Sequence, residues 1–305
     1  MAFFSALAAV ALEHVRPLRQ PLPHYRRYNL FIQWLERKFN AGEFSHGAIA
    51  WAIAVGPLLA GVWLVFSLLA GISPLLGWAW NVVVLYVTLG FKYFSDDAER
   101  IARLLGTGEL DAARAQIGTW RGGDASEFSA DDIVRVTIEQ VFAASQRQMF
   151  GVLFWFVLLA PLGPVGAVLF RTASILARRW TDARGSFGGF AQRAFHVVNW
   201  LPARLTALTY AIAGNFEDAT FCWRTQAAGW PETEDGVVLA AGAGAMGVRL
   251  GQSLNVAHET VWRPELGVGQ APDAECIESA VSMIWRGLVI WLVAGLLIVI
   301  AGWMG

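Results

Sequence analysis

Charge is scarce in this sequence of 305 residues: Asp, Glu, Lys and Arg make up only 15% of it, where soluble domains carry about 25%. The longest gap, residues 47–91, runs for 45 residues without one charged side chain. A helix of that length would reach roughly 68 Å, more than twice the thickness of a hydrocarbon core of about 30 Å. Because residues 71–74 (Gly-Ile-Ser-Pro) favour a turn, the segment predicts two membrane crossings. We therefore expect an integral membrane protein.

Cysteine, histidine and basic tracts are also sparse, which argues against several kinds of site. Cys222 and Cys276 lie in apolar or mixed sequence and are expected to be unpaired thiols. The five histidines form no pair with ligand spacing, so we expect no metal site. No tract rich in Lys and Arg alternates with aromatic residues, so we expect no nucleic-acid partner.

Three further apolar segments are candidates for membrane insertion. Residues 1–12 are too short to cross alone and predict a short anchor helix, whereas the 18 uncharged residues 287–304 predict a final span. Residues 149–170 are long enough to cross, but Pro161 and Pro164 interrupt them. This segment is either a kinked span or a broken helix that enters the membrane and returns to the same side.

The distribution of basic residues favours the returning, re-entrant interpretation. Segment 13–46 has more basic than acidic residues and should be cytoplasmic, and two crossings in 47–91 would return the chain to that side. A full crossing by 149–170 would then leave a second basic group outside. Its members are Arg171, Arg178, Arg179, Arg184 and Arg193. A re-entrant segment keeps them in the cytoplasm, with its irregular backbone against protein or a watery cavity.

The remaining segments predict short helices. Residues 201–213 and 237–248 are apolar but too short to cross a membrane. Residues 92–148 predict an amphipathic insertion on the cytoplasmic side, with one helix after Gly108 and another that Ser129 caps. No segment has a convincing strand period. We therefore predict one all-α membrane domain over 1–305, a multi-helix bundle with a broken helix and the cytoplasmic insertion 92–148.

Two features carry candidate chemistry within the apolar sequence. Residues 242–247 match G-x-G-x-x-G, but without a preceding strand the small residues favour close helix packing. Arg204 follows Pro202, which predicts a position near the start of a helix, where Arg204 and Asn199 would bind an anion. Alternatively, Arg204 reaches toward lipid headgroups. Arg249 allows the same two interpretations.

Glu139 is the candidate acid, placed on a predicted helix just before the broken segment. Its carboxylate could act as a base or hold a metal ion. A solvated helix face explains it equally well.

A series of short motifs runs along the chain. They are Pro23-His-Tyr-Arg26, Trp34-Leu-Glu-Arg-Lys38, the run 108–114, Ile138-Glu139, Leu153-Phe-Trp155, the run 163–168, the run 199–206, the run 243–251 and the run 263–267. In this order and spacing they resemble the CobD/CbiB family and its distant relative AmpE, over most of the chain.

The resemblance implies a multi-pass protein of the bacterial inner membrane in late cobalamin biosynthesis. Enzymes of this family join adenosylcobyric acid to an aminopropanol phosphate by ATP-dependent amide bond formation. The resemblance implies Mg²⁺ and ATP as cofactors of such a synthase. It implies two kinds of partner, namely membrane lipid and a corrinoid or phosphorylated small-molecule ligand. It implies Glu139 and Asp124 as catalytic residues, and Asn199, Arg204 and Arg249 as residues that bind the anionic substrate.

The departures from the family pattern fall on polar residues. Gly-Arg-Asp-Thr becomes Gly-Gly-Asp-Ala at 122–125, and Glu-Asn-Thr-Ser-Asp-Gly becomes Ala-Ala-Ser-Gln-Arg-Gln at 143–148. An Asp ahead of Asn199 is replaced by His196, as in AmpE-like proteins. Two hypotheses follow: a working or altered synthase, and a non-catalytic AmpE-like membrane sensor or accessory protein. The chemistry favours the second, because Ala143 and Arg147 cannot bind Mg²⁺, whereas the motifs favour the CobD/CbiB family.

Overall fold

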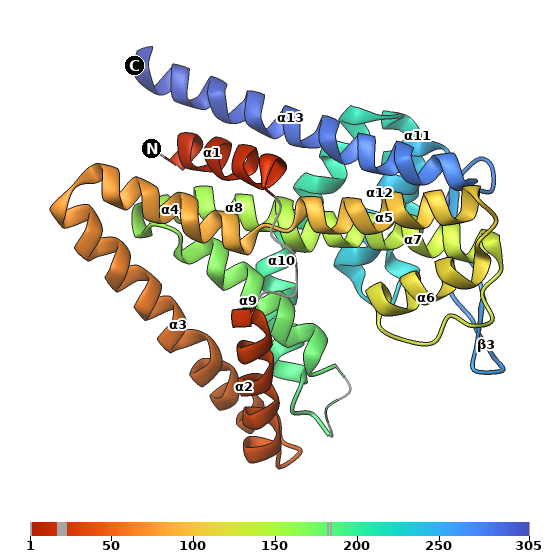
Figure 1. Ribbon diagram of the computed structural model, residues 1–305, viewed down its shortest axis with the longest axis horizontal. Helices are drawn as coiled ribbons and strands as arrows, with labels where there is room; N and C mark the ends of the chain where they lie inside the picture. Colours follow the sequence, from red (N-terminus) through yellow and green to blue (C-terminus); the bar gives the residue numbers. More distant parts are fainter. Residues whose placement is uncertain (1, 17–22, 182, 184, 305) are drawn as a thin grey trace. The chain divides into compact units, whose positions relative to one another are not determined.

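The computed structural model describes residues 2–16, 23–181, 183 and 185–304, and it is predominantly helical (Figure 1). The all-α class is confirmed. Arg184, used above in the charge argument, lies outside the described residues. The chain divides into two compact units, which are described separately: Met1–Tyr93 with Arg147–Trp200, and Phe94–Gln146 with Leu201–Gly305. The single membrane domain stays a prediction.

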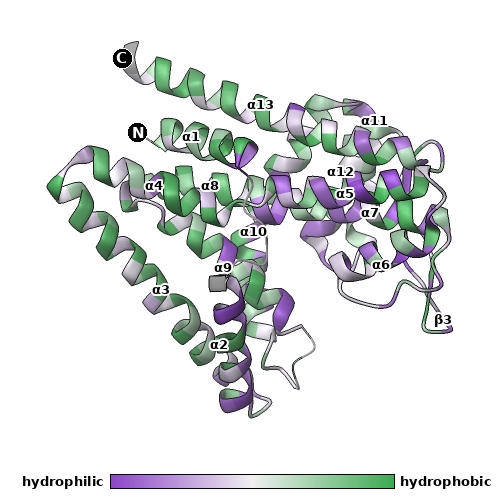
Figure 2. Ribbon diagram, in the orientation of Figure 1, coloured by the Kyte–Doolittle hydropathy of each residue, from purple (hydrophilic) through white to green (hydrophobic). Residues whose placement is uncertain are grey.

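Within the described residues, four helices are long and apolar enough to cross a membrane. They are Phe44–Ile72, Pro74–Gly106, Ala130–Leu158 and Ala274–Gly302. Figure 2 shows α3 (Phe44–Ile72) hydrophobic along most of its length, and only 11% of its most apolar window is buried. An apolar helix surface that the protein leaves uncovered is what lipid would cover. The chain is a membrane protein.

In the first unit, the charge-free segment forms α3 and α4 (Pro74–Thr88), which pack against each other. Ser73 ends α3 and caps α4, since its hydroxyl accepts from the Leu75 backbone N–H at 3.3 Å. The expected pair of helices with a turn is therefore confirmed. The predicted anchor is α1 (Ala2–Val15), which packs against α4 and continues through Glu13. The amphipathic α2 (Pro23–Phe39) packs against α3.

The interrupted segment forms a helical hairpin in the same unit. Helix α8 (Gly151–Leu158) ends in a 3₁₀ turn, η2 (Ala160–Leu162), and α9 (Val165–Arg179) returns along it. Gly163 makes the reversal possible: its φ is +69°, and a Cβ there would lie 2.4 Å from the Phe66 ring. The expected break and return of the chain are confirmed, while the depth of the hairpin in a membrane stays a prediction.

The second unit contains the predicted insertion helices. They are the later part of α5 (Phe91–Gly106), α6 (Leu110–Arg121) and α7 (Ala130–Ser145). Ser129 and Asp132 form a capping box at the start of α7, as the sequence predicts. Helix α7 passes through a π-helical turn, η1 (Gln146–Phe150), into α8.

The same unit includes the later part of α10 (Gly189–Ala213), and then α11 (Phe216–Gln226), η3 (Ala227–Gly229), α12 (Thr233–Met246) and α13 (Ala274–Met304). Helix α13 includes the predicted final span.

Small residues of the G-x-G-x-x-G run let α12 pack closely. A Cβ at Gly242 would lie 2.8 Å from the Phe142 ring, and one at Gly244 would lie 2.5 Å from the Asp218 carbonyl oxygen of α11. Gly247 ends α12 in the left-handed conformation at φ +69°. The helix-packing interpretation is confirmed.

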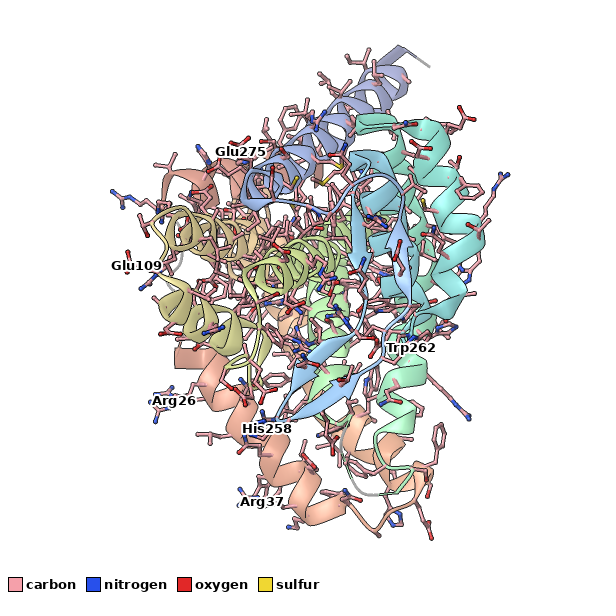
Figure 3. All side chains as sticks on the ribbon, turned by 90° about the vertical axis from the view of Figure 1, so that its right-hand side faces the viewer. Arg26, Arg37, Glu109, His258, Trp262 and Glu275 are labelled. Carbon is pink, nitrogen blue, oxygen red and sulfur yellow. The ribbon has the colours of Figure 1, made fainter. Side chains whose placement is uncertain are left out.

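Four short strands between α12 and α13 were not expected. Strand β1 (Arg249–Gly251) pairs with β4 (Glu265–Gly267), and β2 (Leu254–Val256) pairs with β3 (Glu259–Val261), both antiparallel. Ala257 and His258 turn the inner hairpin at φ +50° and +66°, and Figure 3 shows His258 at its tip. Strands of three residues show too little alternation to be recognised in a sequence. We call residues 249–267 the strap.

Candidate functional site

Glu139 lies on α7 and holds the strap against that helix. Glu139 is only 5% exposed. One carboxylate oxygen, Oε1, accepts from the Gly251 backbone N–H at 2.9 Å, and Oε2 accepts from Arg263 Nη1 at 2.6 Å. Both oxygens are therefore engaged within the protein. A role for Glu139 as a base or metal ligand stays a prediction and would require these bonds to open.

Arg263 completes this clamp from the strap. Its Nε donates to the Gln252 carbonyl at 3.0 Å and its Nη2 to the Gly251 carbonyl at 2.9 Å, while the guanidinium lies 5.5 Å from the Trp230 ring. Gly251 has to be glycine, because a Cβ at φ +75° would lie 2.0 Å from the Pro264 carbonyl oxygen. All three guanidinium nitrogens of Arg263 thus fix the strap. Arg263 was not among the site residues predicted from the sequence, although it begins the motif 263–267.

Two more arginines lie close to the clamp. Arg135 of α7 donates to Gln252 Oε1 and to Asp132 Oδ1. Arg121, the last residue of α6, is half-buried with its guanidinium 5.8 Å from the Phe128 ring. Burial lowers the pKa of Arg121, and the positive charge of Arg263 lowers it further. We call Arg121, Arg135 and Arg263 the arginine cluster.

Arg121 was not among the predicted site residues either. The resemblance expects an arginine at position 123, where this chain has glycine. Arg121 lies two positions earlier, and its guanidinium is close enough for the charge of Glu139 to act on it. A basic residue just before the Gly-Gly pair was the signal available in the sequence.

Asp124, predicted as catalytic, lies in the loop after α6. Its Oδ1 accepts from the Ser126 backbone N–H at 2.9 Å, and this bond lowers the pKa of the exposed carboxyl group. Asp124 lines an open pocket of about 560 Å³ together with Arg114 and Thr119. Among the described residues, Asp124 and Glu139 share no hydrogen bond or ion pair. The contacts therefore do not bring the two predicted catalytic acids together.

Arg204 does not lie at a helix start, so that expectation was wrong. Helix α10 begins at Gly189 and passes through Pro202 without ending, which places Arg204 in its interior. Arg204 Nη1 lies 3.9 Å from Glu234 Oε1, in the first turn of α12. Asn199 is fully buried on the same helix. A free helix N-terminus therefore contributes nothing at Arg204, and binding of an anion there by Arg204 and Asn199 stays a prediction.

Arg249, the third predicted anion ligand, lies on β1. Its Nη1 is 3.8 Å from Glu265 Oε1 on β4, and the two side chains are 44% and 48% exposed. An anion at Arg249 would have to compete with Glu265. The anion-binding role of Arg249 stays a prediction.

Ala143 and Arg147 stand where the resemblance expects acids, and Ser145 and Gln146 between them are neutral, buried polar residues. Ser145 Oγ lies 2.5 Å from the Tyr210 hydroxyl, and Gln146 Oε1 accepts from Thr206 Oγ1 at 2.5 Å. All four residues are fully buried. Mg²⁺ prefers carboxylate and water oxygens, and the described part of the chain brings together no group of three or more His, Cys, Asp or Glu side chains. These residues do not fit a Mg²⁺ site.

Comparisons with known proteins agree along almost the whole chain. A family model described as CobD/Cbib protein matches residues 6–284. The chain is 37% identical to the "Cobalamin biosynthesis protein CobD" of Stutzerimonas stutzeri, over 99% of this chain and 98% of that protein. It is 37% identical to the protein of that name from Chromobacterium violaceum, over 80% of this chain and 77% of that protein. It is 26% identical to "Cobalamin biosynthesis protein CbiB" of Salmonella typhimurium, over 87% of this chain and 86% of that protein. No solved structure matches.

Proposed function

Because this chain belongs to the CobD/CbiB protein family, we propose that it serves the late, membrane-associated stage of cobalamin biosynthesis. The step is the one at which adenosylcobyric acid meets an aminopropanol phosphate. The similarity to a relative named for cobalamin biosynthesis, over 99% of the chain, carries this proposal. The long apolar helices support a multi-pass protein of the bacterial inner membrane.

The residues present support ligand binding better than Mg²⁺-dependent amide bond formation. Phosphoryl chemistry relies on metal ions and cations that neutralise charge on the transferred group. Here the positions 143–146 are neutral and buried, and Glu139 is bonded to Gly251 and Arg263. This chemistry favours the binding of a corrinoid or phosphorylated intermediate by this chain over an ATP-dependent step.

A non-catalytic, AmpE-like membrane sensor is the second candidate. The loss of the family's acids at Ala143 and Arg147 favours it, because the residues between these positions, Ser145 and Gln146, form a neutral buried network with Tyr210 and Thr206. In this case the chain would bind a ligand or partner outside cobalamin synthesis.

Deleting the gene in its own host separates these two candidates. A role in cobalamin synthesis predicts that corrinoid precursors accumulate, that cobalamin-dependent growth fails, and that a plasmid copy restores both. Unchanged corrinoid pools would favour the sensor.

A second experiment tests the amide-forming chemistry. Expression in a strain that lacks its own synthase should restore little or no growth without added cobalamin. Robust growth that is lost in Glu139→Gln but kept in Glu265→Gln would instead assign the synthase reaction to this chain.

A further inference from the structure

The arginine cluster carries more positive charge than its neighbours neutralise. Within this unit, Glu139 pairs with Arg263 and Asp132 pairs with Arg135. Arg121 is the member of the cluster that has no acidic partner among the described residues. In the part of the chain that the structure describes, its guanidinium contacts the Phe128 ring and makes no hydrogen bond or ion pair.

The position of Arg121 is electrostatically costly without an anion. Its guanidinium is half-buried, and the like charge of Arg263 acts on it. Burial and a neighbouring cation both disfavour a charged group, yet a guanidinium stays protonated in proteins. A bound anion would relieve both costs, so these charges indicate a missing negative partner.

Arg135, the second arginine of the cluster on this unit, also has an unsatisfied donor. Its Nη1 and Nη2 are bonded to Gln252 and Asp132, but its buried Nε has no partner among the described residues. A phosphate group carries close to two negative charges and can accept from several donors at once, whereas a carboxylate carries one charge. Guanidinium groups match phosphate oxygens with two parallel bonds.

We propose that Arg121, supported by Arg135 and Arg263, forms a binding site for the phosphate group of a soluble ligand. The predicted anion ligands Arg204 and Arg249 differ from Arg121 in that each has a carboxylate partner. The identification of this ligand with the phosphorylated intermediate rests on the proposed function, while the phosphate site itself rests on the charges.

Inorganic phosphate is the probe for this site. The full chain is placed in nanodiscs of phosphatidylcholine, and phosphate replaces chloride at constant ionic strength while the thermal midpoint and the ³¹P line width are measured. We expect a saturable rise in the midpoint. Arg121→Gln should weaken phosphate binding about tenfold or more, the loss expected for a charge-assisted hydrogen-bonding group. The phosphate affinity of Arg121→Lys should lie between those of the wild type and Arg121→Gln. The control Arg224→Gln, at an exposed position of α11, should bind phosphate as tightly as the wild type.

Several results would overturn the proposal. They are an absence of phosphate binding by the folded wild type, equal binding by Arg121→Gln, and an equal effect of acetate at the same ionic strength. Stabilisation by phosphatidylglycerol nanodiscs alone would make the ligand a lipid headgroup and contradict a soluble one. If phosphate binds at Arg121 while gene deletion leaves corrinoid pools unchanged, the site stands and the proposed function fails.

Discussion

Glu139 and Arg263 lie 124 positions apart in the sequence, and their side chains form a buried ion pair of 2.6 Å. The pair joins α7 to the strap, and the Gly251 backbone N–H of the strap also donates to Glu139 Oε1. The side chains are 6% and 12% exposed, so water screens the pair little. The contact therefore fixes the strap close to Arg121 and sets the geometry of the arginine cluster.

Glu139→Ala should lower the free energy of unfolding by about 3 kcal/mol, because it leaves Arg263 buried and unpaired. The measurement is denaturant or thermal unfolding of the purified protein in one fixed detergent. The control is Glu265→Ala, which removes the partner of Arg249 from a half-exposed pair and should cost about 1 kcal/mol or less. Equal losses in the two variants would show that the Glu139 clamp does not hold the strap.

Local signals explain the parts of the fold that the sequence predicted. The Ser129 cap needs only Asp132 three residues later, and the α3–α4 turn needs only Ser73 and Pro74. The long charge-free run identifies the membrane class by length alone. Each of these signals lies in one continuous stretch of the sequence.

The clamp could not be predicted, because its energy comes from contacts between distant segments. Glu139 alone looks like a solvated helix residue, and Arg263 alone looks like a loop residue. The prediction that Arg204 lies near a helix start was wrong for a related reason. Proline is preferred in the first turn of a helix, but Pro202 lies in the interior of α10. The lost hydrogen bond is one among many in a helix of 25 residues.

Arg204 and Glu234 should be energetically coupled. Their atoms are 3.9 Å apart, and the Glu234 side chain is only 8% exposed, whereas that of Arg204 is 26% exposed. A double-mutant cycle with Arg204→Ala and Glu234→Ala should give a coupling of about 1 kcal/mol in the free energy of unfolding. A coupling near zero would mean that Arg204 holds something other than this carboxylate, such as a headgroup.

Cys222 should react slowly with iodoacetamide in the native protein. It is fully buried on α11, and burial raises the pKa of its thiol, with the charge of Asp218 adding to the effect. The thiolate is the reacting form, so a raised pKa lowers its fraction at every pH below that pKa. In a Cys276→Ser background, mass spectrometry should place the pH midpoint of the native labelling rate above the value of about 8.5 expected for an unperturbed thiol. The SDS-unfolded chain should return to that value, and identical native and unfolded profiles would contradict the burial of Cys222.

Residues 126 and 186 should be labelled from the same, cytoplasmic side of the membrane. Both serines are exposed, and the α8–α9 hairpin lies between them in the sequence. If the hairpin enters the membrane and returns, the basic residues after it stay in the cytoplasm, as the positive-inside rule requires. Ser126→Cys and Ser186→Cys, each in a chain without Cys222 and Cys276, should react with an impermeant maleimide in inside-out vesicles and not in intact spheroplasts. Ser73→Cys, in the turn between α3 and α4, should show the opposite pattern and serves as the control. Labelling of positions 126 and 186 from opposite sides would make the segment 149–170 a true crossing.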